Sequence, residues 1–447
     1  MLGLSLIVLI IVFTSYLIIS RFYEWAAVIA MGAVALLIAI GETIGFFTIN
    51  DAQNSVNLGV LAMMVCLGVF TDVVARSRFF DCCGVKLCRK AKAQPLKLLI
   101  IFNLFTYAVS LILNNLTVVY AVFPLTLLLA RQVGFEKRYF KLLAISIVIS
   151  SNVGGASTAI GDAPNQIIAI TQGIPFIDFL WAMTPVNFLS EMAFLFMISC
   201  LFRRYQRQMR AMNASDRAEA MLAGDLTSRI IAFDYRSTKI DKRFATPSAI
   251  TATLMIIGFV LSGAFDLPLP LVALVGAVAT LLFVPNGHEF IRSAKIKDVL
   301  IMSCLFAMAG AVQATGIIKY IGNLIPKVAK GNSLIAMDLL VILSGVMTVL
   351  CSAGPTAATL VPLAANFVHI VPSHPNLPFF AMSFGVLAGS STNLYSATAG
   401  PIVASRMEEI AGVPLGFWDF LRIGWKVFLV FELIALCFIS MWIILTG

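Results

Sequence analysis

The chain has few charged residues, and this scarcity excludes a soluble globular protein. Lys, Arg, Asp and Glu make up 12% of its 447 residues, whereas hydrophobic residues make up 60%. The charged share is about half of that in soluble domains. The mean hydropathy is +0.97. These values predict an integral membrane protein whose first partner is the lipid bilayer.

Motifs for catalysis and for cofactor binding are also missing. The three histidines, His288, His369 and His374, have no metal-ligand spacing, and there is no nucleotide-binding loop. No nucleophile–base pair and no metal-ligand set falls at membrane depth, so an enzyme is not expected. No cofactor is predicted, apart from Na⁺ or H⁺ as a coupling ion.

Cysteines are few and mostly isolated. Six of the eight stand singly and are expected to be free thiols that act as small apolar residues. Cys82 and Cys83 are adjacent, and binding of a soft metal or metalloid by this pair is the alternative to two free thiols. No structural metal site is predicted.

Long apolar runs are what the sequence has in abundance. Leu2–Ser20 has no basic residue before it and no small-residue cleavage site after it, which favours a retained span over a signal peptide. The chain is predicted to be an all-α polytopic membrane protein, with about ten transmembrane helices, two re-entrant hairpins and broken helices. The runs long enough to span are Leu2–Ser20, Trp25–Phe47, Val56–Val74, Phe176–Phe202, Ala249–Phe265, Leu269–Val284, Leu300–Thr315 and Val427–Leu445.

The uneven distribution of basic residues orients the chain. The segment Arg76–Lys97 carries seven Lys or Arg, and the link Arg203–Thr246 carries ten against five acids. Both are predicted to be cytoplasmic by the positive-inside rule. Three spans precede Arg76, so both termini are expected on the non-cytoplasmic side of a bacterial inner membrane or an equivalent internal membrane. The net charge of +9 is then a topology signal, and no nucleic-acid partner is expected.

Two halves of the chain carry the same landmarks in the same order. Gly173-Ile174-Pro175 precedes Asp178 and Glu191, and after a similar tripeptide at Gly412 the two acids recur 241 residues later. The two glutamates are expected to share a structural role, with proton relay as the alternative. Each half would cross the membrane five times, so the second would be inverted relative to the first. The predicted domains are a first inverted repeat (1–202), a cytoplasmic basic linker (203–246) and a second inverted repeat (247–447).

Residues Ser151–Asn165 interrupt an apolar stretch at bilayer depth. They include three glycines, a proline, two asparagines and an aspartate. In hydrocarbon, each unpaired backbone group costs several kcal/mol unless protein or water meets it. Broken helices of this kind form the solute sites of secondary transporters. A transport site is therefore predicted at this segment.

Further interruptions accompany this one. The apolar arms of Leu98–Ala130 meet at Asn114-Asn115-Leu116-Thr117, which fits either the tip of a re-entrant hairpin or the junction of two short crossings. The second-half counterpart of this tip is Ser352-Ala353-Gly354-Pro355. The counterpart of the broken segment runs from Gly389-Ser390-Ser391-Thr392-Asn393 to Gly400-Pro401.

The candidate substrate- or ion-binding residues are the polar side chains and glycines of these interruptions. Freed N–H groups at half-helix starts attract anions, while freed carbonyls and carboxylates attract Na⁺ or H⁺. The alternative is that Ser, Thr and Asn only bond the helices together. The candidates are Asn114, Asn115, Thr117, Ser151, Asn152, Gly154, Gly155, Ser157, Thr158, Asp162 and Asn165 in the first half, and Ser352, Gly354, Thr356, Ser390, Ser391, Thr392 and Asn393 in the second.

Asp162 is the one acid inside a broken segment. An ionisable side chain within the membrane predicts function, here the exchange of a proton for Na⁺ at a site near Asn115, Asn152 and Asp162. The alternative is that Asp162 caps the following half-helix by accepting from N–H groups near Asn165. The two roles are compatible.

With these residues, the chain resembles the ion transporter superfamily. Ser151–Asn165 resembles the Asn-x-Gly-Gly-Ala … Ile-Gly-Asp-x-Pro-Asn signature of the group holding arsenite permeases, silicon exporters, the melanosomal P protein and sodium/proton antiporters, which have a citrate-transporter-like domain. Leu113–Pro124 resembles that group's hairpin-tip motif. The resemblance implies a scaffold domain, a mobile transport domain with elevator-like movement, and a homodimer. Ser352-Ala353-Gly354-Pro355 and Ser391-Thr392-Asn393 depart from the group's pattern, which leaves the substrate open and disfavours dicarboxylates.

The resulting hypothesis is an ion-coupled secondary active transporter that works by alternating access. Na⁺/H⁺ antiport with Asp162 as the exchanging carboxylate is the first candidate. Proton-coupled export of an oxyanion or metalloid, such as arsenite or silicate, or carriage of another small anion, is the alternative. A channel or a membrane-embedded enzyme is the alternative outside this class.

Overall fold

The protein is built from helices, as its computed structural model shows. The structure describes residues 2–22, 25–91, 94–115, 117–119, 121–123, 126, 137–210, 239–292, 296–320, 328–329 and 332–446. Within these residues there is no β-strand, which confirms the predicted all-α fold class.

The helices fall on either side of the basic link. Before it come α1 (Leu2–Arg21), α2 (Ala26–Ile44), α3 (Ile49–Asn54), α4 (Leu58–Arg76), α5 (Phe79–Ala91), α6 (Pro95–Ser110), α8 (Lys137–Gly155), α9 (Ala163–Gln172) and α10 (Phe176–Arg210). After it come α12 (Lys242–Leu261), α13 (Leu269–Phe283), α14 (Gly287–Arg292), α15 (Ile296–Ala314), α17 (Ser333–Cys351), α18 (Ala353–Ala365), η3 (Val368–Ile370), α19 (Leu377–Ser390), α20 (Gly400–Ala411) and α21 (Phe417–Thr446).

Seven stretches of helix in the described part of the chain are long and apolar enough to cross a membrane. They are α2, α4, α10, α12, α14 with α15, α17 and α21, and shorter apolar helices are α1, α6, α13, α18 and α19. A multi-pass integral membrane protein is thereby confirmed. All eight predicted apolar runs coincide with helices. The helix α17 is missing from them, although its hydropathy matches that of the predicted spans.

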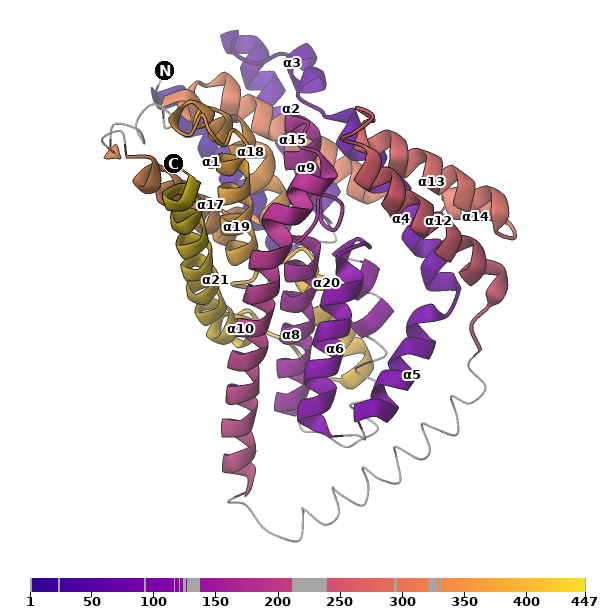
Figure 1. Ribbon diagram of the computed structural model, residues 1–447. Coiled ribbons are helices and arrows are strands. Elements are labelled where there is room, and N and C mark those ends of the chain that lie inside the picture. The colour runs from indigo at the N-terminus through magenta and orange to yellow at the C-terminus, as the bar shows by residue number, and fades with distance from the viewer. Residues whose placement is uncertain are drawn as a thin grey trace.

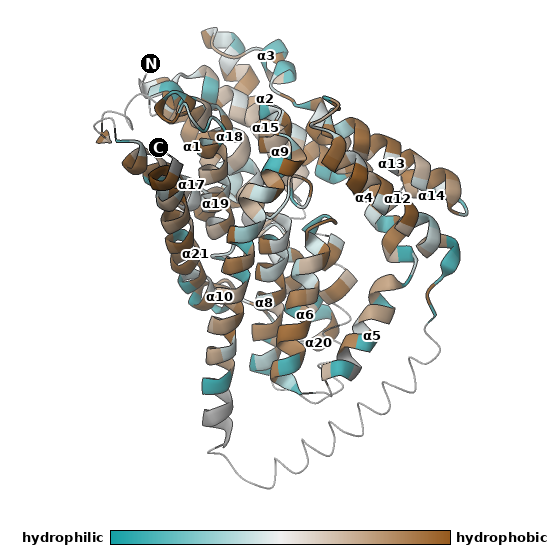
Figure 2. Ribbon diagram, viewed as in Figure 1, coloured by the Kyte–Doolittle hydropathy of each residue, from teal (hydrophilic) through white to brown (hydrophobic). Residues whose placement is uncertain are grey.

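The outer surface of the helices is apolar, as a bilayer requires. Large side chains such as Leu274, Val275 and Leu282 of α13 and Phe196 of α10 are exposed. Figure 2 shows this apolar character along most of the length of α12, α13 and α21. Soluble monomers rarely expose contiguous patches of this kind, whereas lipid chains would cover them.

The chain ends are grouped at one end of the molecule. In Figure 1 both termini lie beside one another, and the last turns of α10 lie at the opposite end. Helix α10 continues to Arg210 and α12 begins at Lys242, so helix extends into both ends of the predicted linker. Residues 211–238 of that linker lie outside the described residues.

One pair of helices packs in the same way in each half. A glycine of the second helix lies against a backbone carbonyl of the first: Gly154 of α8 against Tyr107 of α6, and Gly389 of α19 against Gly345 of α17. A side chain at either glycine would collide with that carbonyl, so the close approach of the two helices requires glycine.

A second equivalence follows directly after these glycines. The Thr158 hydroxyl donates to the carbonyl of Leu111 (2.7 Å), and the Asn393 amide donates to the carbonyl of Val349 (3.0 Å). The two acceptors are 238 residues apart in the sequence. These contacts agree with two structural repeats, while the inverted orientation and the domain bounds stay predictions.

Candidate functional site

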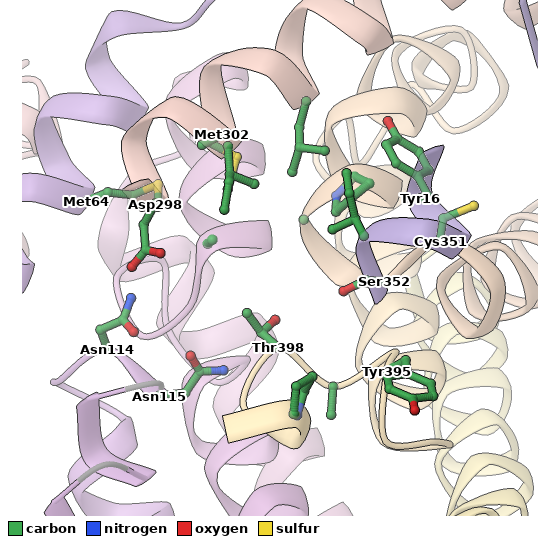
Figure 3. A pocket seen from close by; sticks show the side chains of 18 residues that line it. Tyr16, Met64, Asn114, Asn115, Asp298, Met302, Cys351, Ser352, Tyr395 and Thr398 are labelled. Atoms are coloured by element: carbon green, nitrogen blue, oxygen red, sulfur yellow. The ribbon is translucent and has the colours of Figure 1, made fainter. Parts of the chain in front are cut away.

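The interruptions of both halves meet around one cavity of about 120 Å³. Asn114 and Asn115 border it from the first half, and Ser352 and Gly354 border it from the second half, where α17 ends and α18 begins. Figure 3 shows Asn114 and Asn115 on one side of the cavity and Ser352 on the other. A space of this size holds several water molecules or a small hydrated ion.

Three of the predicted residues, Asn115, Asn152 and Asp162, lie close together beside this cavity, and we call this group the junction. The Asn115 amide lies 3.5 Å from the side-chain oxygen of Asn152, and the Asn115 backbone N–H donates to the carbonyl of Gly161 (3.1 Å). The Asn152 amide donates to the carbonyl of Ser390, at the end of α19 (3.1 Å). The junction therefore joins the hairpin tip, the first broken segment and the second one.

Asp162 begins α9 at the same junction. Its Oδ1 accepts the backbone N–H of Asn165 (3.1 Å), so the predicted capping contact is present. The side chain is 8% exposed, and Oδ2 accepts no hydrogen bond from any residue that the structure describes. The next residue, Ala163, lines the cavity. One carboxylate oxygen thus orders the helix start, and the other has no partner among the described residues.

The glycines of the site have two different surroundings. Gly155 lies close to Asp162, because a Cβ built on it would be 3.1 Å from the Asp162 Cβ and 3.3 Å from the Asn115 Cβ. Gly154 faces α6 and does not line the cavity. Gly354 does line it, and the nearest atom to a Cβ there is the Met302 methyl at 3.5 Å.

Asn165 holds the broken segment in shape. Its amide donates to the carbonyls of Ala156 (2.7 Å) and Thr158 (3.1 Å), and its side-chain oxygen accepts from Ser383 of α19 (2.6 Å). The side chain is buried, and it satisfies backbone groups that the chain break leaves without helical partners. Asn165 therefore holds the site in shape without lining the cavity itself.

Several of the other candidates bond to their own helices. The hydroxyls of Ser151, Ser157, Thr356, Ser390 and Thr392 each donate to a carbonyl three or four residues earlier. This is the local bonding that Ser and Thr commonly make within helices. These bonds do not join two helices, and the role of these residues in binding stays a prediction.

The remaining candidates are buried near the breaks. Asn393 orders the loop after α19 by accepting from the N–H groups of Tyr395 (2.9 Å) and Ser396 (2.8 Å). Thr117 follows Asn115 in a helical turn. Ser391 is fully buried, and its hydroxyl has no partner among the described residues.

The structure adds residues that the sequence analysis missed. Asp298, in the first turn of α15, lines the cavity and lies on the same side as Asn114 in Figure 3. Thr398 and Tyr395 line it from the loop before α20. An acid at the start of the apolar run Leu300–Thr315 was the available signal for Asp298. Of the described residues that line the cavity, none is Lys, Arg or His.

A second, larger cavity of about 550 Å³ lies where α3, α4, α9, α15 and α18 meet. Its polar lining includes Asn57, Thr171 and Gln313. Four elements, α4, α9, α15 and α18, border both cavities. The larger one therefore offers a wet space close to the broken helices.

Metal-binding clusters were sought in the described residues, and no group of three His, Cys, Asp or Glu side chains lies close enough together to hold an ion. Cys82 and Cys83 of α5 are free thiols, the first buried and the second partly so. Among the described side chains, no third ligand lies close enough to this pair to complete a soft-metal site.

Comparison with known proteins gives a consistent picture. A family model described as a citrate transporter matches residues 7–385. The magnetosome protein MamN of Magnetospirillum gryphiswaldense is 27% identical over 393 residues, 88% of this chain and 86% of its own. An uncharacterized transporter of Mycobacterium tuberculosis is 25% identical over 445 residues, 98% of each chain. The human P protein is 24% identical over 480 aligned residues, which cover 92% of this chain and 56% of that longer protein.

A solved structure shares the fold. The YdaH transporter of Alcanivorax borkumensis matches with a TM-score of 0.53 and 14% identity, over 96% of this chain and 98% of that one. At this identity the likeness concerns the fold alone.

Proposed function

Because the chain belongs to the citrate transporter family, within the ion transporter superfamily that its motifs predict, we propose that it is an ion-coupled secondary active transporter. In this proposal it works by alternating access and exchanges Na⁺ for H⁺, with Asp162 as the exchanging carboxylate. That it is a membrane transporter follows from the family; the ions and the mechanism are the proposal.

The observation that carries the proposal is the junction of Asn115, Asn152 and Asp162. The Asn115 and Asp162 side chains both lie against Gly155, and the Asn115 amide lies 3.5 Å from the Asn152 oxygen. One Asp162 oxygen accepts no hydrogen bond from the described residues. The described residues that line the adjoining cavity include no basic one. Either a proton or a Na⁺ ion would neutralise the carboxylate, so the binding of one excludes the other. Such competition at one alternately exposed site is the requirement for antiport.

The hydrogen bonds between the two halves support an elevator-like movement. Asn152 of α8 is bonded to the end of α19, and Asn165 of α9 is bonded to Ser383 of α19. The broken elements of both halves are thus tied together and would move as one body. The larger cavity beside α9 and α18 would then be an access route from one side.

Export of a metalloid or oxyanion is the second candidate, and the start of α18 favours it. Ser352 has a positive φ of 72°, and its side chain does not cap the helix. The N–H groups of Ala353 and Gly354 are therefore uncapped at the start of α18, where Gly354 borders the cavity. Such groups attract oxygen atoms of anions or of neutral hydroxylated solutes. Asp298 in the same lining disfavours a free tricarboxylate, because like charges repel.

Proteoliposomes with a trapped pH indicator test the proposal. An inward gradient of Na⁺, Li⁺ or K⁺ is imposed in turn, and then arsenite, silicate or citrate, with empty liposomes as the control. Antiport predicts that Na⁺ alone drives protons outward. Proton movement with arsenite or silicate, but not with Na⁺, would favour the second candidate, and movement with citrate alone would contradict both.

Its setting in the membrane is also part of the proposal. We expect a bacterial inner membrane or an equivalent membrane, both termini on the non-cytoplasmic side, and a homodimer. The grouping of the two termini away from the last turns of α10 supports the placement of the termini. Mass photometry of the purified protein in lipid nanodiscs would show whether one or two chains are present.

A further inference from the structure

A separate group of buried polar side chains lies between α6, α8 and α10. Asn103, Tyr107 and Ser110 follow one another at intervals of four and three on α6, so they share a helix face. Asn187 and Glu191 share a face of α10, and Ser150 belongs to α8. All six are buried, and none of them lines the cavity. We call this group the polar seam.

Contacts place the members of the seam against one another. The Ser150 hydroxyl donates to Glu191 Oε1 (2.7 Å). The rings of Tyr107 and Phe188 lie 6.2 Å apart, which brings α6 against α10 one turn from Glu191. A Cβ on Gly154 would meet the Ser110 Cβ at 2.8 Å, so Ser110 faces α8. Helices α6, α8 and α10 thus pack together here, and α8 supplies the hydrogen bond to the Glu191 carboxyl.

The seam contains more polar atoms than hydrogen bonds. Both amide atoms of Asn103 and of Asn187, the Ser110 hydroxyl and Glu191 Oε2 have no partner among the described residues. Buried polar groups in proteins are nearly always paired, and internal water supplies the partner where the protein does not. The unpaired atoms include both donors and acceptors. Water satisfies such a mixture, whereas a bare metal ion would need oxygen ligands only.

Among the described residues, no hydrogen bond or ion pair gives Glu191 a positively charged partner. Of the two basic residues of α21, Arg422 lies near Asp419, and the Lys426 amine lies over the Trp425 ring (5.8 Å). On α6 the titratable neighbour is Tyr107, and α19 carries no titratable group near it. The basic residues of α8 and α12 are in their first turns, and Lys141 of α8 is paired with Asp419 of α21 (2.6 Å). Glu432 of α21 faces Gly345 of α17. An ionised Glu191 would have no counter-charge there, so its resting form holds a proton.

The second half lacks this polar environment. Glu432 occupies the position that matches Glu191, and it is buried as well. The position of Tyr107 in the first half is taken by Gly345 in the second half, and the position of Asn187 is taken by Phe428. Both Gly345 and Phe428 lie beside Glu432. A shared structural role would need only the two glutamates. Only Glu191 has these additional polar neighbours, and they therefore point to a function of the first half.

One end of the seam reaches the junction of the candidate site. A Cβ on Gly161 would lie 2.7 Å from the carbonyl of Ser110, and Gly161 directly precedes Asp162. Water in the seam would therefore connect Glu191 with the region of Asp162.

We propose that the polar seam is a hydrated proton-binding site, in which the Glu191 carboxyl takes up and releases one proton through internal water. A role of this site in coupling proton movement to transport rests on the proposed function. The binding of the proton by Glu191 does not.

Infrared difference spectroscopy of the full-length protein in lipid tests the site directly. Spectra are recorded across a pH series for the wild type, for Glu191→Gln and, as the matched control, for Glu432→Gln. We expect a carboxylic-acid band that shrinks as pH rises, is absent from Glu191→Gln and is unchanged in Glu432→Gln. A Glu191 band that is constant over the series, or no such band at any pH, would overturn the proposal.

A second variant guards against failure of Glu191→Gln to fold. Asn187→Leu keeps the carboxyl and removes a water-bonding amide from the seam. The proposal predicts that its Glu191 band titrates at a different pH from that of the wild type, and an unchanged titration would contradict it.

If the Glu191 band titrates but no Na⁺/H⁺ exchange occurs, the antiport proposal fails and the site stands. If exchange occurs and the band does not titrate, the site fails alone.

Discussion

At the scale of single residues, Asp162 has one observed role, the cap of α9, and one proposed role, ion exchange. One carboxylate oxygen caps α9, and the other accepts no hydrogen bond from the described residues. Capping requires only a hydrogen-bond acceptor, whereas ion exchange requires a negative charge. Substitution can therefore separate the two roles.

The capping role predicts a difference in stability between two substitutions. Asn is as good an N-cap as Asp, whereas Ala cannot accept the bond from Asn165, so Asp162→Ala should lose about 1 kcal/mol relative to Asp162→Asn. The midpoint of thermal unfolding of each purified variant in lipid measures this. Equal midpoints for the two variants would show that the cap contributes nothing.

The solute-binding role predicts an effect at Asn115. This side chain lines the cavity and lies next to Asn152, so Asn115→Ala should remove about 1 kcal/mol of binding, a rise of about fivefold in the apparent KM. Ser391→Ala is the matched control, because Ser391 is buried and does not line the cavity. Transport assays over a range of substrate concentration measure both. A larger effect at Ser391 than at Asn115 would place the solute elsewhere.

At the scale of elements, the close contact of α6 with α8 depends on Gly154, whereas the start of α18 has space at Gly354. Gly154→Ala would drive a methyl group into the Tyr107 carbonyl and should destabilise the fold by about 1–3 kcal/mol. Gly354→Ala meets only a side-chain methyl at 3.5 Å, so it should fold normally and raise the apparent KM by narrowing the cavity. Thermal unfolding and transport, measured together, check the contrast. Normal stability in Gly154→Ala would contradict it.

The sequence predicted the elements of the fold better than the contacts of the site. Hydropathy predicted eight of the helices, and the glycines and proline of Ser151–Asn165 predicted the break between α8 and α9. The cavity was harder to predict, because Asp298 and Tyr395 come from elements far apart in the chain, and a single sequence contains no distances. Hydroxyls such as Ser157 could not be sorted in advance either, since bonding within a helix and binding of a solute call for the same residue type.

At the scale of the whole molecule, the order of the two halves predicts which side of the membrane each loop faces. Single cysteines at positions 215 and 373, in a background without the native cysteines, should react with a membrane-impermeant reagent from opposite sides. Ser373 lies in the turn before α19, and Ser215 lies outside the described residues. Reaction of both from the same side would contradict the inverted repeat and, with it, the alternating-access model.

The central claim, that Asp162 exchanges Na⁺ for H⁺, is tested most directly by Na⁺-driven proton efflux from proteoliposomes that contain the wild type or Asp162→Asn. The variant keeps the helix cap but has no charge to exchange. We predict efflux for the wild type that depends on the pH gradient, and efflux for Asp162→Asn no greater than from empty liposomes, with normal folding and insertion. Wild-type efflux in Asp162→Asn, with the same pH dependence, would contradict the account.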